Sequence, residues 1–95
     1  MKAVRVRAIV GGRVQGVFFR GFTERSAIGL GIRGWVRNQS DGRVEVLAEG
    51  TRENLLAFLA ALGRGPAAAR VDAVDTVWSE ATGEFSEFRI LSSTY

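Results

Sequence analysis

The chain has 95 residues, 46% of them hydrophobic, which is enough for one domain with one core. It contains no cysteine and no histidine, which excludes disulfides, thiolate nucleophiles, imidazole bases and metal sites built on these residues. The formal charge of +3 gives a modest attraction for anions, without the dense basic stripe and interleaved aromatics of many nucleic-acid-binding domains. Any catalysis must therefore use carboxylates, hydroxyls, amides, Lys, Arg or the backbone.

The first segment, residues 2–10, alternates apolar residues with Arg5 and Arg7 and is predicted to be a half-buried strand. It lacks the apolar stretch of a secretory signal, and no run approaches the roughly 18 apolar residues of a membrane span. We therefore expect a cytoplasmic protein. Gly11 and Gly12 are expected to open a loop that runs through Gly16.

Residues 19–30 are predicted to form a helix, because their apolar side chains recur at helical spacing and glycines flank the end. Residues 32–38 and 43–49 alternate as two strands, joined into a hairpin by Asp41-Gly42. In the second of these strands, Val44, Val46 and Ala48 should point inward. Glu45 and Glu49 should then point outward, as surface positions and not as a catalytic acid pair.

A second helix is predicted from Thr51, a suitable N-cap, to Gly63 and Pro66, with Leu55, Phe58, Leu59 and Leu62 buried. Residues 70–78 form a fourth strand, and Phe88 and Ile90 share one phase of a last strand. The order predicts an α+β protein of the ferredoxin-like βαββαβ type, with room for a short extra edge strand. In this fold two helices cover one face of an antiparallel sheet. The fold alone names no function.

The loop between the first strand and the first helix reads Gly12-Arg13-Val14-Gln15-Gly16-Val17-Phe18-Phe19-Arg20. Glycines let successive backbone N–H groups converge on an anion, and the start of the next helix adds its free N–H groups. The stretch is therefore a candidate phosphate site, although glycine-rich loops of this kind are common. It lacks the Lys-Ser/Thr ending of a P-loop.

Two polar side chains near this loop allow two interpretations each. Arg20 falls in the first helical turn, where it can grip a phosphate or form a surface pair with Glu24; spacing alone does not decide. Asn38 ends a strand in the phase of Ile32 and Val36, where its amide can bind water. From spacing alone, however, the favoured role of Asn38 is to close the hairpin loop.

The loop motif resembles the signature loop of the acylphosphatase family. A second block, Leu30-Gly31-Ile32 followed by Gly34-Trp35-Val36-Arg37-Asn38 and Asp41-Gly42, is similar to the next conserved stretch of that family. The resemblance continues to Phe85, Phe88 and Ile90. It covers essentially the whole chain, so residues 1–95 are expected to form a single acylphosphatase-like domain.

The resemblance implies specific roles for these positions. Arg20 matches the family arginine that binds the phosphoryl group, and Asn38 matches the asparagine that orients the attacking water. The backbone amides expected to cradle the phosphate are those of Val14, Gln15, Gly16, Val17, Phe18 and Phe19. The family hydrolyses small acyl phosphates to a carboxylate and inorganic phosphate, needs no metal or cofactor, and suggests a monomer that binds neither nucleic acid nor membrane.

The chemistry fits a chain without histidine. The leaving carboxylate has a conjugate acid with a pKa of about 4, so it departs unprotonated at neutral pH. Trp35 and Trp78 can line an acyl pocket, but packing against the sheet is the favoured role. Phe18, Phe19 and Phe22 are expected in the core and not as a substrate platform. An alternative function is a non-catalytic ferredoxin-like module that binds anions or nucleic acid. A domain once fused to a larger enzyme is a further possibility.

Overall fold

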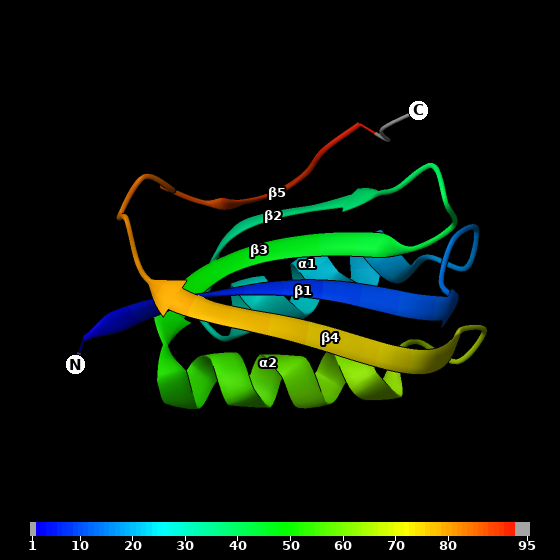
Figure 1. Ribbon diagram of the computed structural model, residues 1–95, viewed down its shortest axis with the longest axis horizontal. Coiled ribbons are helices and arrows are strands. Elements are labelled where there is room, and N and C mark those ends of the chain that lie inside the picture. The colour runs from blue at the N-terminus through cyan, green and yellow to red at the C-terminus, as the bar shows by residue number, and fades with distance from the viewer. Residues whose placement is uncertain (1, 93–95) are drawn as a thin grey trace.

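The structure is a computed structural model that describes residues 2–92. Its elements follow in the order β1 (Ala3–Arg13), α1 (Phe19–Gly29), β2 (Arg33–Asn38), β3 (Val44–Thr51), α2 (Arg52–Arg64), β4 (Arg70–Glu80) and β5 (Phe88–Ile90). The predicted βαββαβ order is confirmed, and β5 is the extra edge strand (Figure 1). Within residues 2–92, neither helix is long and apolar enough to cross a membrane.

The strands form one sheet in the order β4-β1-β3-β2-β5. The first four pair antiparallel, with Val6 opposite both Ala48 and Trp78. The edge strand β5 pairs parallel to β2 instead, with Gly34 opposite Phe88, so the sheet is mixed and not wholly antiparallel. This pairing brings the end of the described chain alongside β2, close to the first helix (Figure 1).

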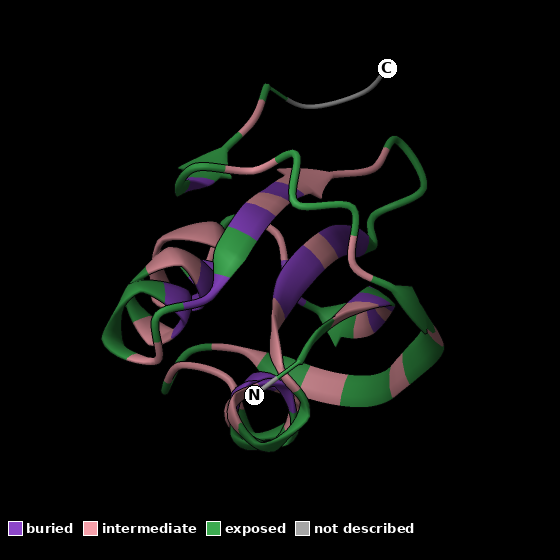
Figure 2. Ribbon diagram, turned by 90° about the vertical axis from the view of Figure 1, so that its left-hand side faces the viewer, coloured by how far each residue is buried: buried purple, intermediate pink, exposed green. Residues whose placement is uncertain are grey.

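Both helices pack on one face of the sheet, and the core lies between the two layers (Figure 2). The apolar phase of β1 and β3 points into it, and α2 contributes its buried stripe. Fully buried core side chains include Val6, Val10, Val46, Phe19, Phe58 and Leu62. Thr23 of α1, which the apolar pattern missed, is also buried, because its hydroxyl donates to the Phe19 carbonyl at 2.9 Å.

The first strand is longer than predicted, because it continues through both glycines. The register of β1 against β4 shifts between Gly11 and Gly12, a bulge after which pairing resumes at Gly12 and Val71. Gly12 has a φ of 125°, and a Cβ there would lie 2.2 Å from the Arg70 carbonyl oxygen. Glycine at this position therefore extends the strand, and the loop begins only at residue 14.

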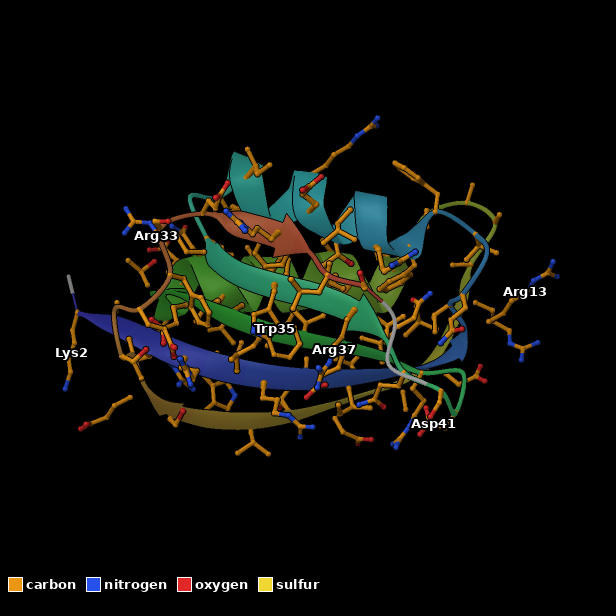
Figure 3. The ribbon with its side chains drawn as sticks, turned by 90° about the horizontal axis from the view of Figure 1, so that it is seen from above. Lys2, Arg13, Arg33, Trp35, Arg37 and Asp41 are labelled. Carbon is orange, nitrogen blue, oxygen red and sulfur yellow. The ribbon has the colours of Figure 1, made fainter. Side chains whose placement is uncertain are left out.

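The uncovered face of the sheet holds two glutamates that were expected at the surface, yet Glu45 is 4% and Glu49 6% exposed. Glu45 accepts from Arg7 at 2.6 Å and from Arg37 at 2.9 Å, and Arg37 in turn stacks on Trp35 (Figure 3). Burial alone would raise the pKa of Glu45, but the two guanidinium groups outweigh burial and hold the pKa below its ordinary value. Outward-pointing carboxylates are thus covered by arginine side chains.

Glu49 binds the segment that connects β4 to β5. It accepts from Arg5 at 2.7 Å and from the backbone N–H groups of Thr82 at 2.9 Å and Gly83 at 3.0 Å. Burial opposes the charged form, but these donors hold the pKa of Glu49 below its ordinary value. The buried carboxylate therefore helps to determine where the chain turns back toward β5.

Candidate active site

Three segments that are far apart in sequence meet at one end of the sheet (Figure 1). They are the loop of residues 14–18 before α1, the hairpin loop of residues 39–43 after β2, and the end of β5. The loop before α1, the start of α1, the end of β2 and the end of β5 line an open pocket of about 270 Å³. Its lining consists of Val14, Gly16, Phe18, Phe19, Arg20, Gly21, Asn38 and Ile90.

The pocket gathers most of the residues singled out from the sequence. Arg20 and Asn38, 18 positions apart in the sequence, line the same hollow. Of the six loop residues, Val14, Gly16, Phe18 and Phe19 line it as well, whereas Gln15 and Val17 do not. Neither tryptophan does; Trp35 and Trp78 are half-buried elsewhere on the sheet.

The backbone of the loop suits an anion. Gly16 has a φ of 73° and Phe18 a φ of 65°, so left-handed residues alternate with ordinary ones, as in anion-binding nests. Within the described part of the chain, the N–H groups of residues 15–18 donate to no other protein group. The loop then enters α1, which has neither a side-chain cap nor an acidic residue in its first turn. Several donors are therefore available at one helix start.

Arg20 is the second residue of α1 and is held by the far end of the chain. Its Nη1 donates to the Leu91 carbonyl oxygen, just beyond β5, at 3.2 Å. Among residues 2–92 it forms no ion pair with Glu24, so the surface pair considered above is not the one observed. Arg20 also lines the pocket, and its other N–H groups have no partner among the described residues.

Asn38 is the last residue of β2 and lies opposite Val44. It shares the helix-facing phase of Val36, as the alternation predicted. The hairpin loop closes without its side chain, because Gln39 N–H donates to the Arg43 carbonyl at 2.8 Å. Asn38 Oδ1 is covered by protein and has no partner among the described residues. Since the terminal amide torsion is soft, rotation can turn this acceptor toward the pocket.

A tether between the two loops could not be found in the sequence. The Gln15 side chain donates from Nε2 to the carbonyl oxygens of Gln39 at 2.7 Å and Arg43 at 2.9 Å. It thereby joins the loop before α1 to the hairpin that follows Asn38. The family resemblance implied only a backbone role for Gln15, and partners more than 20 residues away leave no local pattern in the sequence.

The three phenylalanines at the start of α1 behave differently from one another. Phe19 is 1% exposed and belongs to the core as predicted, and the half-buried Phe22 packs against it at 6.1 Å between ring centres. Phe18 is 59% exposed, so its assignment to the core was wrong. Phe18 also differs in its backbone, which is left-handed with a φ of 65°.

Comparison with known proteins assigns the chain to a family. A family model described as Acylphosphatase matches residues 6–90. The chain belongs to the acylphosphatase family. It is 52% identical over 87 residues to an acylphosphatase from Methylococcus capsulatus, covering 92% of this chain and 95% of that one. The acylphosphatase crystal structure from Bacillus subtilis matches with a TM-score of 0.90 and 39% identity, over 93% of this chain and 98% of that one.

The same acylphosphatase fold also occurs inside a larger protein. Full-length HypF, whose crystal structure is described as phosphate- and nucleotide-bound, matches with a TM-score of 0.83 and 29% identity. The match covers 95% of this chain but 12% of HypF. The two acylphosphatases above are, by contrast, spanned almost completely, so the relatives of this chain include proteins of its own size.

Proposed function

We propose that this acylphosphatase hydrolyses the carboxyl–phosphate anhydride of small acyl phosphates, releasing a carboxylate and inorganic phosphate. The observation that carries the proposal is the convergence of Arg20, Asn38 and the unpaired loop amides on one pocket. A guanidinium and several N–H groups form a site for a phosphoryl group, and the amide side chain beside them suits a water molecule.

The phosphoryl group is assigned to the loop and Arg20. Phosphoryl transfer passes through a loose transition state whose charge spreads over the three equatorial oxygens. N–H groups of residues 14–19 and the Arg20 guanidinium would neutralise that charge in a preorganised arrangement. The Leu91 carbonyl restrains Arg20 before substrate binds, which reduces the ordering that binding must impose.

Asn38 is assigned to the attacking water. When the amide oxygen accepts a hydrogen bond from the water molecule, it fixes the direction of the water's lone pairs. In-line attack on phosphorus depends on that direction. The water loses its proton to the phosphate itself, so no histidine base is needed. The pocket lining has no carboxylate among the described residues, and the chain has no histidine or cysteine, which supports metal-independent hydrolysis.

The leaving group determines which phosphates can react. A carboxylate leaves unprotonated at neutral pH, whereas an alkoxide needs an acid that this lining does not provide. Acyl phosphates should therefore react far faster than alkyl phosphate monoesters. We also propose that residues 1–95 form a single domain that is a monomer, which gel filtration can test. We propose that it is cytoplasmic, without nucleic-acid or membrane partners, which cell fractionation can test.

Hydrolysis of benzoyl phosphate in excess EDTA tests this proposal, with wild type compared with Asn38→Ala. We expect chelator-resistant turnover by the wild type and a kcat lowered about 10- to 100-fold in the variant. Inhibition by inorganic phosphate should stay the same, because water and phosphate have separate binding groups.

Asn54→Ala is the matched control, since Asn54 lies at the start of α2 and outside the pocket. Its kcat should equal that of the wild type. Loss of phosphate binding in Asn38→Ala would contradict the role assigned to Asn38. A folded wild type that binds phosphate without turnover would favour the anion-binding module instead.

A further inference from the structure

Two strongly exposed apolar side chains line the pocket. Five large hydrophobic residues in the described chain are strongly exposed: Phe18, Ile28, Leu56, Val77 and Ile90. Two of them, Phe18 and Ile90, line the pocket that holds Arg20 and Asn38. They come from opposite ends of the sequence and line the same pocket, where a bound acyl phosphate would place its acyl group.

Phe18 is placed there against its local preferences. A bulky residue in the left-handed region costs about 1–2 kcal/mol, which glycine at the same position would avoid. The ring is 59% exposed, so burial in the core does not offset that cost. Strained, exposed aromatic residues at a pocket point to a functional use of the ring.

A second unfavourable choice in the same helix supports this interpretation. Gly21 lies inside α1, where glycine is less stable than alanine by about 1 kcal/mol. A Cβ on Gly21 would lie 2.2 Å from Phe18 Cε1, so glycine leaves room for the ring in this position and a larger residue would displace it. Arg25, one turn further along, places its guanidinium over the ring at 5.1 Å. The helix is therefore shaped around Phe18.

Ile90 approaches the same pocket from β5. It shares the phase of Phe88, which is 5% exposed and packs edge-on against Phe58 in the core. Two residues further on, Ile90 is 40% exposed, because the core ends there and the pocket begins. The next residue, Leu91, holds Arg20 through its carbonyl. Ile90 is thus fixed beside the phosphate-binding arginine.

The remaining lining offers nothing to a charged acyl group. Of the described residues around the pocket, Arg20 alone is charged, and Asn38 supplies the other polar side chain. Once the phosphoryl group and the water occupy these two, the surfaces left for the acyl group are apolar. A second carboxylate on the acyl group would lose hydration against these apolar surfaces, and the Arg25 guanidinium over the Phe18 ring lies outside the lining.

We propose that Phe18 and Ile90 form the contact surface for the acyl group, and that they select apolar and aromatic acyl groups. This inference rests on the proposed hydrolysis of acyl phosphates at the same pocket. Phe18 supplies an aromatic ring on the α1 side, and Ile90 supplies an aliphatic side chain on the β5 side. Inorganic phosphate, which has no acyl group, does not use either side chain, although the Phe18 backbone N–H belongs to the loop that would hold it.

The test compares kcat/KM for benzoyl phosphate and acetyl phosphate in the wild type, Phe18→Asn and Ile90→Thr. Asparagine tolerates the left-handed region and threonine keeps the β-branch, so both variants preserve the backbone. The ratio of benzoyl to acetyl kcat/KM should fall about tenfold in Phe18→Asn and about threefold in Ile90→Thr. Inhibition by inorganic phosphate should change less than twofold.

Ile28→Thr is the matched control, because Ile28 is also strongly exposed but lies on α1 outside the pocket, and its ratio should equal that of the wild type. An unchanged ratio in both pocket variants would overturn the selectivity proposal and leave acyl phosphate hydrolysis intact. An equal loss of kcat/KM on both substrates, together with weaker inhibition by phosphate, would also overturn the selectivity proposal. In that case Phe18 would only determine the conformation of the loop. Failure of the wild type on both substrates would instead reject the proposed function.

Discussion

Both helices lie on the same face of the sheet, and each follows a strand, but they begin in different ways. At α2, Thr51 is extended and its hydroxyl accepts from the Asn54 N–H at 3.2 Å, and Glu53 adds negative charge to the first turn. At α1, Phe18 is left-handed, no side chain caps the helix, and the first turn carries Arg20 and no acid. At the start of α2 the Asn54 N–H has a side-chain partner, whereas no side chain caps the start of α1.

The comparison shows how a helix start can remain open without losing its position. A local cap on α1 would use the donors that an anion needs. The start of α1 is held by distant contacts instead: Gln15 bonds to the hairpin loop, and Arg20 bonds to the Leu91 carbonyl. These contacts fix the loop while leaving its N–H groups unpaired.

Removing the charge at the open start should have the largest effect. We expect Arg20→Ala to lower kcat/KM for benzoyl phosphate by about 10²–10³, because one preorganised donor to the developing oxyanion is lost. Inhibition by inorganic phosphate should weaken as well. Steady-state kinetics with phosphate as competitor measures both.

The control for this prediction is Arg52→Ala, since Arg52 is the first residue of α2 and stacks on Trp78 at 4.6 Å. It removes an arginine from the capped start and should leave kcat/KM unchanged. If both variants lost activity alike, general electrostatic attraction would explain the role of Arg20 better than its position.

Cutting the tether to the hairpin should have an intermediate effect. The Gln15→Met substitution keeps a side chain of similar length but removes two hydrogen bonds, so the free energy of unfolding should fall by about 1–2 kcal/mol. We also expect kcat/KM to fall about tenfold, because the loop and Asn38 are no longer fixed relative to each other. Urea unfolding and kinetics on one preparation measure both quantities.

Gln39→Met is the matched control, because the Gln39 side chain approaches Glu45 at 3.4 Å and not the loop. It should retain nearly full kcat/KM. A Gln15→Met enzyme that is less stable but fully active would show that the tether serves folding alone.

Removing the cap from the closed start should have the smallest effect on activity. Thr51→Ala should lower the free energy of unfolding by about 1 kcal/mol, because the Asn54 N–H loses its partner. Its kcat/KM should not change. Activity that fell with Thr51→Ala would show that the two helix starts are not independent.

The sequence predicted those parts of the fold that depend on local patterns. Alternation along β1 and β3 and the apolar stripe of α2 correctly gave the layers and the core. The predicted end of β1 was wrong, because Gly11-Gly12 was expected to open a loop, whereas Gly12 forms a bulge within the strand. The parallel pairing of β5 could not be predicted, because three residues carry too little pattern to specify a partner strand.

The candidate site was predicted mainly through the family resemblance, and its supporting contacts were not. Spacing alone left the role of Arg20 open and favoured hairpin closure for Asn38, whereas the structure places both residues in one pocket. The contact between Arg20 and Leu91 joins residues 71 positions apart, for which a single sequence offers no signal. The phase of a strand gave the direction of Glu45 correctly but not its burial, because the covering arginines come from other strand positions.

The contact between Arg20 and Leu91 also has a consequence for how the protein is made. Synthesis proceeds from the N-terminus, so the loop, α1 and Asn38 leave the ribosome well before β5. Until β5 pairs with β2, Arg20 lacks its carbonyl partner and the pocket lacks Ile90. A nascent chain that has folded as far as β4 would therefore hold the phosphate loop without a complete site.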